Sequence, residues 1–425
     1  MTDWLMKNFP KSVVFFYPET LSAELLIVAL EKILFSFPIF SGRLRIANGS
    51  LLIDCNNEGV RFSLCDESSS LAQTIENLSA ANSHRLVDRI DPKRAIAQQY
   101  PVLTIRLTQF SNGGTALGIC WHHAIGDMST FMTFLKAWSA AVNGVPYISP
   151  SIVEDRSAYL LQRIPENKNL PSNVRYLQTK DLLKLAIYLQ TTARRRTSVK
   201  ILFSDSELKK MKQVFSEKAG QTLSRNDVLC AHLSSLIANL DDYDRDRYLA
   251  IAVNYRNKLG LPQKLLGNLL DAINIPLPQN TSPSEIALKI RTGVDYFATR
   301  HLSVTSTHKY IENNGGAEKI NRFLSKSLDP IKRSIAISSW ANFGVYDITF
   351  LDASPLYVTS VGDSPIPWIC SIVEGFENKG LIYTATLPKQ LVRKLTQPDS
   401  LQRLHKYRSP SETRSSQTES LSWLL

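Results

Sequence analysis

Apolar runs and amphipathic helical patterns alternate along the first part of the chain. Runs rich in β-branched and aromatic residues predict strands, and apolar residues that recur every three or four positions predict helices. Strands are predicted at 12–17, 43–47, 51–55, 102–109 and 115–121, and helices at 21–37, 71–82 and 128–142. Asn48-Gly49 is typical of a hairpin turn between two of these strands. Interleaved strands and helices predict α/β layering around a mixed sheet.

The periodicity weakens between residues 147 and 197, where prolines stand at 150, 165 and 171. This stretch predicts a crossover that contains one helix at about 180–192. A strand at 199–203 then restores regular structure, followed by a helix that begins near Ser204. We therefore expect an N-terminal domain over 1–160, a crossover over 161–198 and a C-terminal domain over 199–407. Residues 408–425 are rich in Ser, Thr and charge and predict a disordered tail.

Composition narrows the function classes. The 425 residues carry a formal net charge of +11, but the basic residues are dispersed and no nucleic-acid-binding motif accompanies them. Five scattered cysteines without C-x-x-C spacing are typical of free thiols in a reducing compartment. The most apolar segment, 25–40, is broken by Glu31 and Lys32 and is too short to cross a bilayer. These features predict a cytoplasmic protein that binds neither nucleic acid nor membrane.

The candidate chemistry lies in Trp121-His122-His123-Ala124-Ile125-Gly126-Asp127, between a predicted strand and a predicted helix. Successive strand side chains point to opposite faces, so the two imidazoles cannot both face one site. His123 stands four residues before Asp127, which leaves room for a tight turn. An imidazole is the usual general base near neutral pH. A histidine and an aspartate at this spacing also occur often by chance, so the pattern needs support from elsewhere in the chain.

Several further stretches give that support, because together they resemble the BAHD acyltransferases, which are coenzyme-A-dependent enzymes that acylate alcohols and amines. His-His-Ala-Ile-Gly-Asp is similar to their H-x-x-x-D motif. Other similar stretches are Pro38 to Leu44, Ile53 to Phe62, Asp155-Arg156-Ser157, Val253 to Lys258, Leu266-Gly267-Asn268, and Ser338-Ser339-Trp340 with Tyr346-Asp347. These stretches follow the family's order from about residue 12 to about residue 395.

The resemblance implies a fold and a reaction. The implied fold is α/β and chloramphenicol-acetyltransferase-like, with two domains of mixed sheets and flanking helices around a central channel. Acyl-coenzyme A would be a co-substrate, with no bound cofactor, and a small molecule would accept the acyl group on a hydroxyl or an amine. Such enzymes are usually monomers. No nucleophile elbow is visible in the sequence, which favours direct attack by the acceptor over an acyl-enzyme.

The resemblance also implies roles for individual residues. Asp127 would pair with Arg256 and act as a structural residue, while Trp340 would donate its indole N–H to the oxyanion. Packing in a core is the alternative role for Trp340. Ser12 and Ser338 are candidates for contacts with the acceptor. The remaining histidines are isolated, so no metal site is predicted.

Ser224-Arg225-Asn226 begins a predicted helix whose N-terminus suits an anion, in a region that lies near the coenzyme in related enzymes. We expect these three residues to contact coenzyme A. The alternative, that they only cap a core helix, is equally compatible with the sequence.

The sequence departs from the family at two places. Thr349-Phe350-Leu351-Asp352-Ala353 stands where the family has D-F-G-W-G, and only the phenylalanine is kept. Met128 follows Asp127 where the family usually has glycine. The chain is therefore identified as a divergent member with a degenerate second motif. Two rival functions stay open, namely a condensation-type enzyme that takes its acyl group from a carrier protein, and a non-catalytic binding relative.

Overall fold

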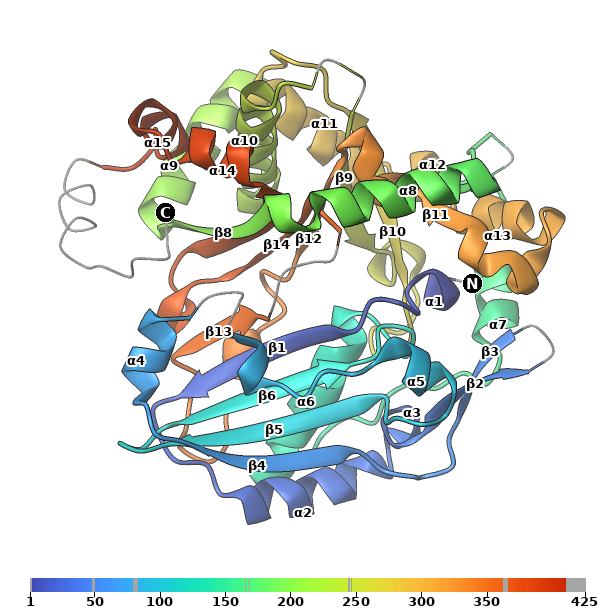
Figure 1. Cartoon of the computed structure of the whole chain (residues 1–425), viewed down its shortest axis with the longest axis vertical. Helices are drawn as coiled ribbons and strands as arrows, with labels where there is room; N and C mark the ends of the chain where they lie inside the picture. The colour runs from blue at the N-terminus through green and yellow to red at the C-terminus, as the bar shows by residue number, and fades with distance from the viewer. Residues whose placement is uncertain are drawn as a thin grey trace.

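The computed structural model shows two sheet-based units joined into one molecule (Figure 1). It describes residues 2–47, 50–78, 83–164, 166–167, 169–243, 245, 247–361 and 366–409. The first unit is built on a five-stranded sheet of order β13-β1-β6-β5-β4, and the second on a six-stranded sheet of order β10-β9-β12-β14-β15-β8. Both sheets mix parallel and antiparallel pairs.

The strand that leads into the candidate histidines, β6, is the central strand of the first sheet. Its strands are β1 (Lys11–Tyr17), β4 (Arg61–Glu67), β5 (Leu103–Phe110), β6 (Thr115–Trp121) and β13 (Tyr357–Ser360). Every residue of β6 is buried, because β1 and β5 pair with it on either side and helices cover it. A buried central strand gives the loop that follows it a rigid base.

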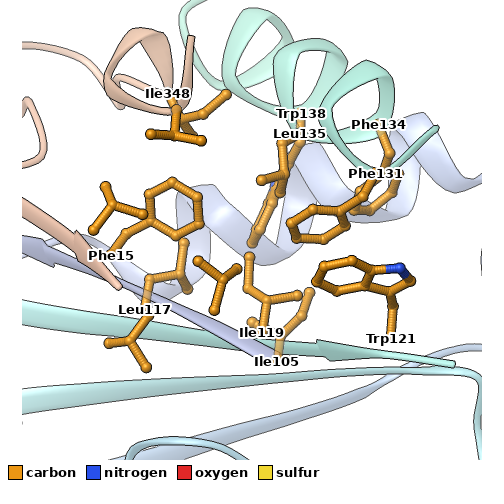
Figure 2. Packing of buried hydrophobic residues seen from close by; sticks show 14 of the residues in the cluster. Phe15, Ile105, Leu117, Ile119, Trp121, Phe131, Phe134, Leu135, Trp138 and Ile348 are labelled. Carbon is orange, nitrogen blue, oxygen red and sulfur yellow. The ribbon is translucent and has the colours of Figure 1, made fainter. Parts of the chain in front are cut away.

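Two helices, α2 (Ala23–Leu34) and α6 (Met128–Val142), pack on this sheet. Figure 2 shows α6 lying over the strands, with Phe131, Phe134, Leu135 and Trp138 directed at residues of the sheet. The ring of Trp121, the last residue of β6, stacks on Phe131 with centroids 3.9 Å apart. This contact fixes the spacing between the end of β6 and the start of α6, and the candidate motif lies in between.

The second sheet is covered by helices on one face. Its strands are β8 (Arg196–Phe203), β9 (Tyr248–Asn254), β10 (Leu270–Pro276), β12 (Ile335–Ser339), β14 (Ile369–Glu374) and β15 (Leu381–Pro388). The helices that share its core include α9 (Asp205–Ala219), α10 (Arg225–Leu240), α11 (Pro283–Asp295) and α14 (Lys389–Leu395). Residues on the other face, such as Ala252 and Ser338, lie outside this core.

The described chain has further strands and α-helices. They are β2 (Arg43–Ala47) paired with β3 (Ser50–Asp54), β7 (Val174–Tyr176) paired with β11 (Phe323–Ser325), and the helices α1 (Thr2–Leu5), α3 (Pro38–Ser41), α4 (Leu71–Glu76), α5 (Pro92–Ile96), α7 (Arg156–Arg163), α8 (Thr179–Thr192), α12 (Phe297–Arg300), α13 (Val304–Asn313) and α15 (Pro398–Leu404). No helix within the described ranges combines the length and the apolar content that a membrane crossing requires.

The chain returns from the second unit to the first after Trp340. Strand β13 pairs antiparallel with β1, and so a strand from late in the chain forms an edge of the first sheet. The segment before β13 is tied to the first unit, since the Tyr17 hydroxyl donates to the carbonyl of Ile348 at 2.9 Å. The domain limits at 160 and 198 stay predictions. They assign the residues of β13 to the C-terminal domain, although this strand belongs to the sheet of the first unit.

Most predicted elements are present with shifted ends. The helix predicted over 21–37 ends at Leu34, and Pro38 opens the separate short helix α3 because proline is favoured at a first helical position. The helix predicted over 71–82 ends at Glu76, and the strand predicted over 199–203 begins at Arg196. The hairpin turn at 48–49 and residues 410–425 of the expected tail lie outside the described residues.

Candidate active site

The segment between β6 and α6 is a compact turn whose shape follows from its residues. The Trp121 indole N–H donates to the carbonyl of Gly126 at 3.2 Å, which folds the turn back on the strand end. A Cβ at Gly126 would lie 2.3 Å from the Cγ2 of Thr130, so only glycine fits there. Asp127 is the N-cap of α6, and its carboxylate accepts the backbone N–H of Thr130 at 2.9 Å.

His122 supports this turn from inside. The side chain is fully buried, and its Nδ1 accepts the backbone N–H of Ala124 at 3.3 Å. Burial, followed by the neighbouring His123, lowers the pKa of His122 to about 4. An uncharged imidazole that accepts a backbone hydrogen bond serves to hold the turn rather than to carry protons.

His123 occupies the next position and is 9% exposed. Burial first, and then the Lys11 ammonium, lower the pKa of His123 to about 4, whereas its own backbone carbonyl, Asp127 and Asn268 act in the opposite direction. The ring is therefore uncharged at neutral pH and free to accept a proton. Both histidines lie just past the end of β6, in the turn itself.

Asp127 and Arg256 form the contact that the resemblance implied. Their side chains are 1% and 0% exposed, and two hydrogen bonds of 2.8 and 3.2 Å join the guanidinium to both carboxylate oxygens. The carboxylate also accepts the backbone N–H groups of Thr130 and Leu269, each at 2.9 Å. A carboxylate with all its acceptor positions occupied by fixed donors positions the turn and is not available to a substrate.

Arg256 extends this contact into the second unit. Its guanidinium donates to the carbonyls of Leu265 and Gly267, both at 3.0 Å, and to the Thr130 hydroxyl at 3.2 Å. The same hydroxyl donates to the carbonyl of Gly267 and accepts its N–H, both at 3.0 Å. The start of α6 in the first unit is thereby fixed to the loop that leads into β10 of the second.

Asn268 is a site residue that the sequence reasoning missed. Its side-chain amide donates to the carbonyl of His123 at 2.7 Å and to the carboxylate of Asp3 at 2.6 Å. Asp3 in turn pairs with Arg156 at 3.1 Å. The signal was present, because Asn268 and Arg156 both belong to stretches that resemble the family. Nothing in the sequence indicated that both contact Asp3 or that Asn268 binds the backbone of His123.

The remaining candidates near the junction of the units are placed less directly. Trp340 follows β12, is 6% exposed and belongs to the buried cluster of the first unit. Ser338 lies on β12 on the face away from α10, and Ser12 lies on β1 opposite Cys120. No hydrogen bond among the described residues joins the side chains of Ser12, Ser338 or Trp340 to His123. Their assigned roles stay predictions.

The predicted coenzyme contacts lie at the start of α10. The Ser224 hydroxyl accepts the N–H of Asp227 at 3.1 Å in a capping box, and Arg225 pairs with Asp205 at 2.7 Å on the surface. The side-chain oxygen of Asn226 accepts a hydrogen bond from the Cys230 thiol, with 3.8 Å between the two atoms. Capping is thus one role of Ser224 in this structure, while contact with coenzyme A stays a prediction for all three residues.

The surroundings of the other reactive side chains do not fit a catalytic role. Cys120 packs with Ile90 and Ala95 in a separate buried cluster, and burial raises the pKa of its thiol. Within the described ranges, no three His, Cys, Asp or Glu side chains are grouped to hold a metal ion. His232 is a buried core histidine, with Nε2 2.8 Å from the carbonyl of Leu404.

Comparison with known proteins decides the family. The model of the Transferase family matches residues 2–401. The chain belongs to this family, the BAHD acyltransferases. The shikimate O-hydroxycinnamoyltransferase of Nicotiana tabacum is a relative with 25% identity over 386 residues, covering 84% of each chain.

Solved structures similar to this BAHD protein show its fold. They include F. graminearum TRI101 complexed with ethyl coenzyme A, with a TM-score of 0.74, 15% identity and coverage of 95% of this chain and 96% of that chain. Vinorine synthase has a TM-score of 0.69, 19% identity and coverage of 95% and 92%. The predicted two-domain α/β fold with mixed sheets is confirmed.

Proposed function

We propose that this BAHD protein transfers an acyl group from acyl-coenzyme A to a hydroxyl or amine of a small molecule, with His123 as the general base. One observation carries the assignment. His123 is uncharged and sits on a turn that the buried Asp127–Arg256 pair and Asn268 hold in place from both units. Such fixation of a neutral imidazole is what a general base needs.

The reaction follows from this geometry. The His123 imidazole takes the proton of the acceptor hydroxyl or amine as that atom attacks the thioester carbonyl. The carbon–sulfur bond then breaks, and the imidazolium returns the proton to the departing thiolate. The acceptor gains an ester or an amide, and coenzyme A leaves as a thiol. No acyl-enzyme is proposed, because Cys120, three positions before His123 in the sequence, is buried in a different cluster.

Other residues complete the proposal. Trp340 would donate its indole N–H to the oxyanion, and Ser12 and Ser338 would contact the acceptor within the central channel. Ser224, Arg225 and Asn226 would contact coenzyme A at the start of α10. We also propose that the protein works as a monomer in the cytoplasm, where its five free cysteines would stay reduced.

Thiol release from a panel of acyl-coenzyme A donors, each mixed with pooled alcohols and amines, tests the function. The wild type should release thiol only when an acceptor is present, and His123→Ala should lose this release by a factor of at least about 100. His122→Asn is the matched control, because the Asn oxygen can accept the Ala124 N–H as the His122 Nδ1 does. Equal rates for wild type and His123→Ala, or release only from a loaded carrier protein, would overturn the proposal.

A further inference from the structure

A second site lies on the second unit, at the β10 edge of its sheet. It is a cavity of about 440 Å³ between the crossover, the end of α12 and the loops that follow β11. This volume is in the range of small-molecule sites. Its lining residues include Ser172, Arg175, Tyr248, Ala272, Asn274, Arg300, His301, Lys326, Asp329 and Lys332.

The cavity is strongly basic. Among its lining residues, Arg175, Arg300, Lys326 and Lys332 are cationic and only Asp329 is acidic. Arg175 already neutralises Asp329, to which it donates two hydrogen bonds of 2.9 and 3.1 Å. Three cations therefore remain without a carboxylate partner in the described part of the chain.

The contacts of these three cations leave their charge available. The Lys326 ammonium donates to the carbonyl of Ser172 at 2.7 Å, and the Arg300 guanidinium lies 4.4 Å from the ring centre of Tyr296. Burial, and then Lys332, lower the pKa of Lys326, so these two ammonium groups repel each other. Like charges held together in a concave site favour an anion.

The sheet face that lines the cavity also carries Ser338, one of the two proposed acceptor contacts. Ala272 lies on the sheet face away from the α10 core and pairs with Ala252 of β9. Strand β12 pairs with β9 so that Ile337 faces Ile251, which puts Ser338 in the same row as Ala252. Two strand spacings thus separate Ala272 from Ser338, or about 10 Å. A molecule lying along this face can reach both.

We propose that this cavity binds an anionic group of the acceptor, a carboxylate or a phosphate, about 10 Å beyond the row of Ser338. The proposal rests on the acyltransferase function above and specifies its acceptor as an extended, negatively charged molecule. Lys326, Lys332 and Arg300 recognise the anion, and Tyr248 and Asn274 line the wall beside it. Reaction at His123 then takes place at the other end of the acceptor.

The phosphates of coenzyme A are the other source of such an anion. The proposed coenzyme contacts lie by Asp205, whose carboxylate accepts the N–H of Gly380 next to β15. They are therefore near the β8 edge of the sheet, whereas the cavity is at the β10 edge. Five strand spacings, or about 24 Å, separate the two edges. This separation favours the acceptor.

Calorimetric titration with inorganic pyrophosphate, on protein saturated with coenzyme A, tests the cavity directly. The wild type should bind one equivalent saturably, and Lys326→Met/Lys332→Met should bind at least about tenfold more weakly. Lys180→Met/Lys209→Met removes the same charge from exposed positions on α8 and α9 and should bind as the wild type does. Lys332→Met alone, which breaks no described contact, guards against misfolding of the double variant and should also weaken binding.

Two further measurements show whether the anion that binds in the cavity belongs to the acceptor or to coenzyme A. Affinity for coenzyme A should be equal in all variants, and a loss confined to the cavity variants would assign the cavity to the coenzyme and overturn the proposal. For any acceptor acid that is turned over, the cavity variants should raise KM for the acid and leave kcat and the methyl ester unchanged. Equal effects on acid and ester, or no saturable pyrophosphate binding by the wild type, would also overturn it. Absence of turnover with every acceptor would count against the acyltransferase function, while pyrophosphate still decides the cavity.

Discussion

At the scale of single residues, the low pKa of His123 predicts how the rate of catalysis depends on pH. The base must be uncharged, and burial lowers its pKa from 6.5 to about 4. We therefore expect kcat/KM to stay constant as the pH falls from neutral and to reach half its value near pH 4. An enzyme with an exposed imidazole as its base would reach half its value near pH 6.5. A profile measured with a neutral acceptor checks this. An acid limb near pH 6.5 would contradict the burial of the ring in the free enzyme.

His122 supplies the control for this profile, because its pKa is also lowered to about 4. In His122→Asn the acid limb should be unchanged, which would assign it to His123. Folding must be followed in parallel. The unfolded chain takes up these protons near pH 6.5 and the folded chain only near pH 4, so the stability of the native state falls as the pH drops through this interval.

The residues of the site were predictable where a local motif carried them. The Asp127–Arg256 contact followed from two stretches that resemble the family, and the structure confirms it. Asn268 and Lys11 were missed as neighbours of His123, because they come from a loop 145 residues later and a strand 112 residues earlier. The sequence around each of these two residues gives no indication that folding brings the residue next to His123.

At the scale of elements, the degenerate second motif still works as a structural anchor. The Phe350 ring packs against Trp138 and Tyr17, with centroids 5.4 and 5.7 Å away. The Asn143 side chain, at the end of α6, donates to the carbonyl of Thr349 and accepts the N–H of Leu351. The segment thus fixes the return of the chain to the first unit, and its changed sequence keeps the phenylalanine, which packs in the core.

Leu351 stands where the family has the glycine after that phenylalanine, and its backbone has a left-handed φ of 55°. This conformation costs a non-glycine residue about 1–2 kcal/mol, while glycine loses about 0.5–1 kcal/mol of stability through its freer unfolded chain. Since the side chain is 58% exposed, Leu351→Gly should raise the free energy of unfolding by about 0.5–1 kcal/mol. Urea unfolding measures the change. Leu351→Ala keeps the strain, and an equal gain from it would refute the explanation.

The elements themselves were predictable in proportion to their length and periodicity. The helix predicted over 128–142 and the strand predicted over 115–121 have the predicted ends. Strand β13 was not predicted, since it has only four residues and its partner is β1, more than 340 positions away. Short strands whose stability comes from distant pairing leave little local pattern.

At the scale of the whole molecule, buried polar contacts unite two units that each have a core of their own. Arg256 and Asn268 of the second unit bind the turn of the first, and β13 crosses back to complete the first sheet. Because this junction also carries His123, the two units must be docked for the site to exist. A substitution that weakens the contact between the two units should therefore lower both the stability of the protein and its activity.

Arg256→Met tests this coupling. It leaves the Asp127 carboxylate buried without its partner, which should cost about 3–5 kcal/mol of unfolding free energy. It should also split the single calorimetric transition into two and lower acyl transfer at temperatures where both units remain folded. Asp127→Asn/Arg256→Met removes the unpaired charge and should recover part of the stability but not the activity, because the turn still lacks its clamp.

Arg225→Met is the matched control, because it removes an arginine of the same unit from an ion pair at 2.7 Å whose side chains are 48% and 54% exposed. Exposed pairs contribute about 0–1 kcal/mol, so this variant should keep a single transition and stay within about 1 kcal/mol of the wild type. The difference between the two variants then measures burial at the junction rather than loss of an arginine. If both destabilise equally, or if Arg256→Met unfolds in one transition with full activity beforehand, the junction is not what holds His123 in place.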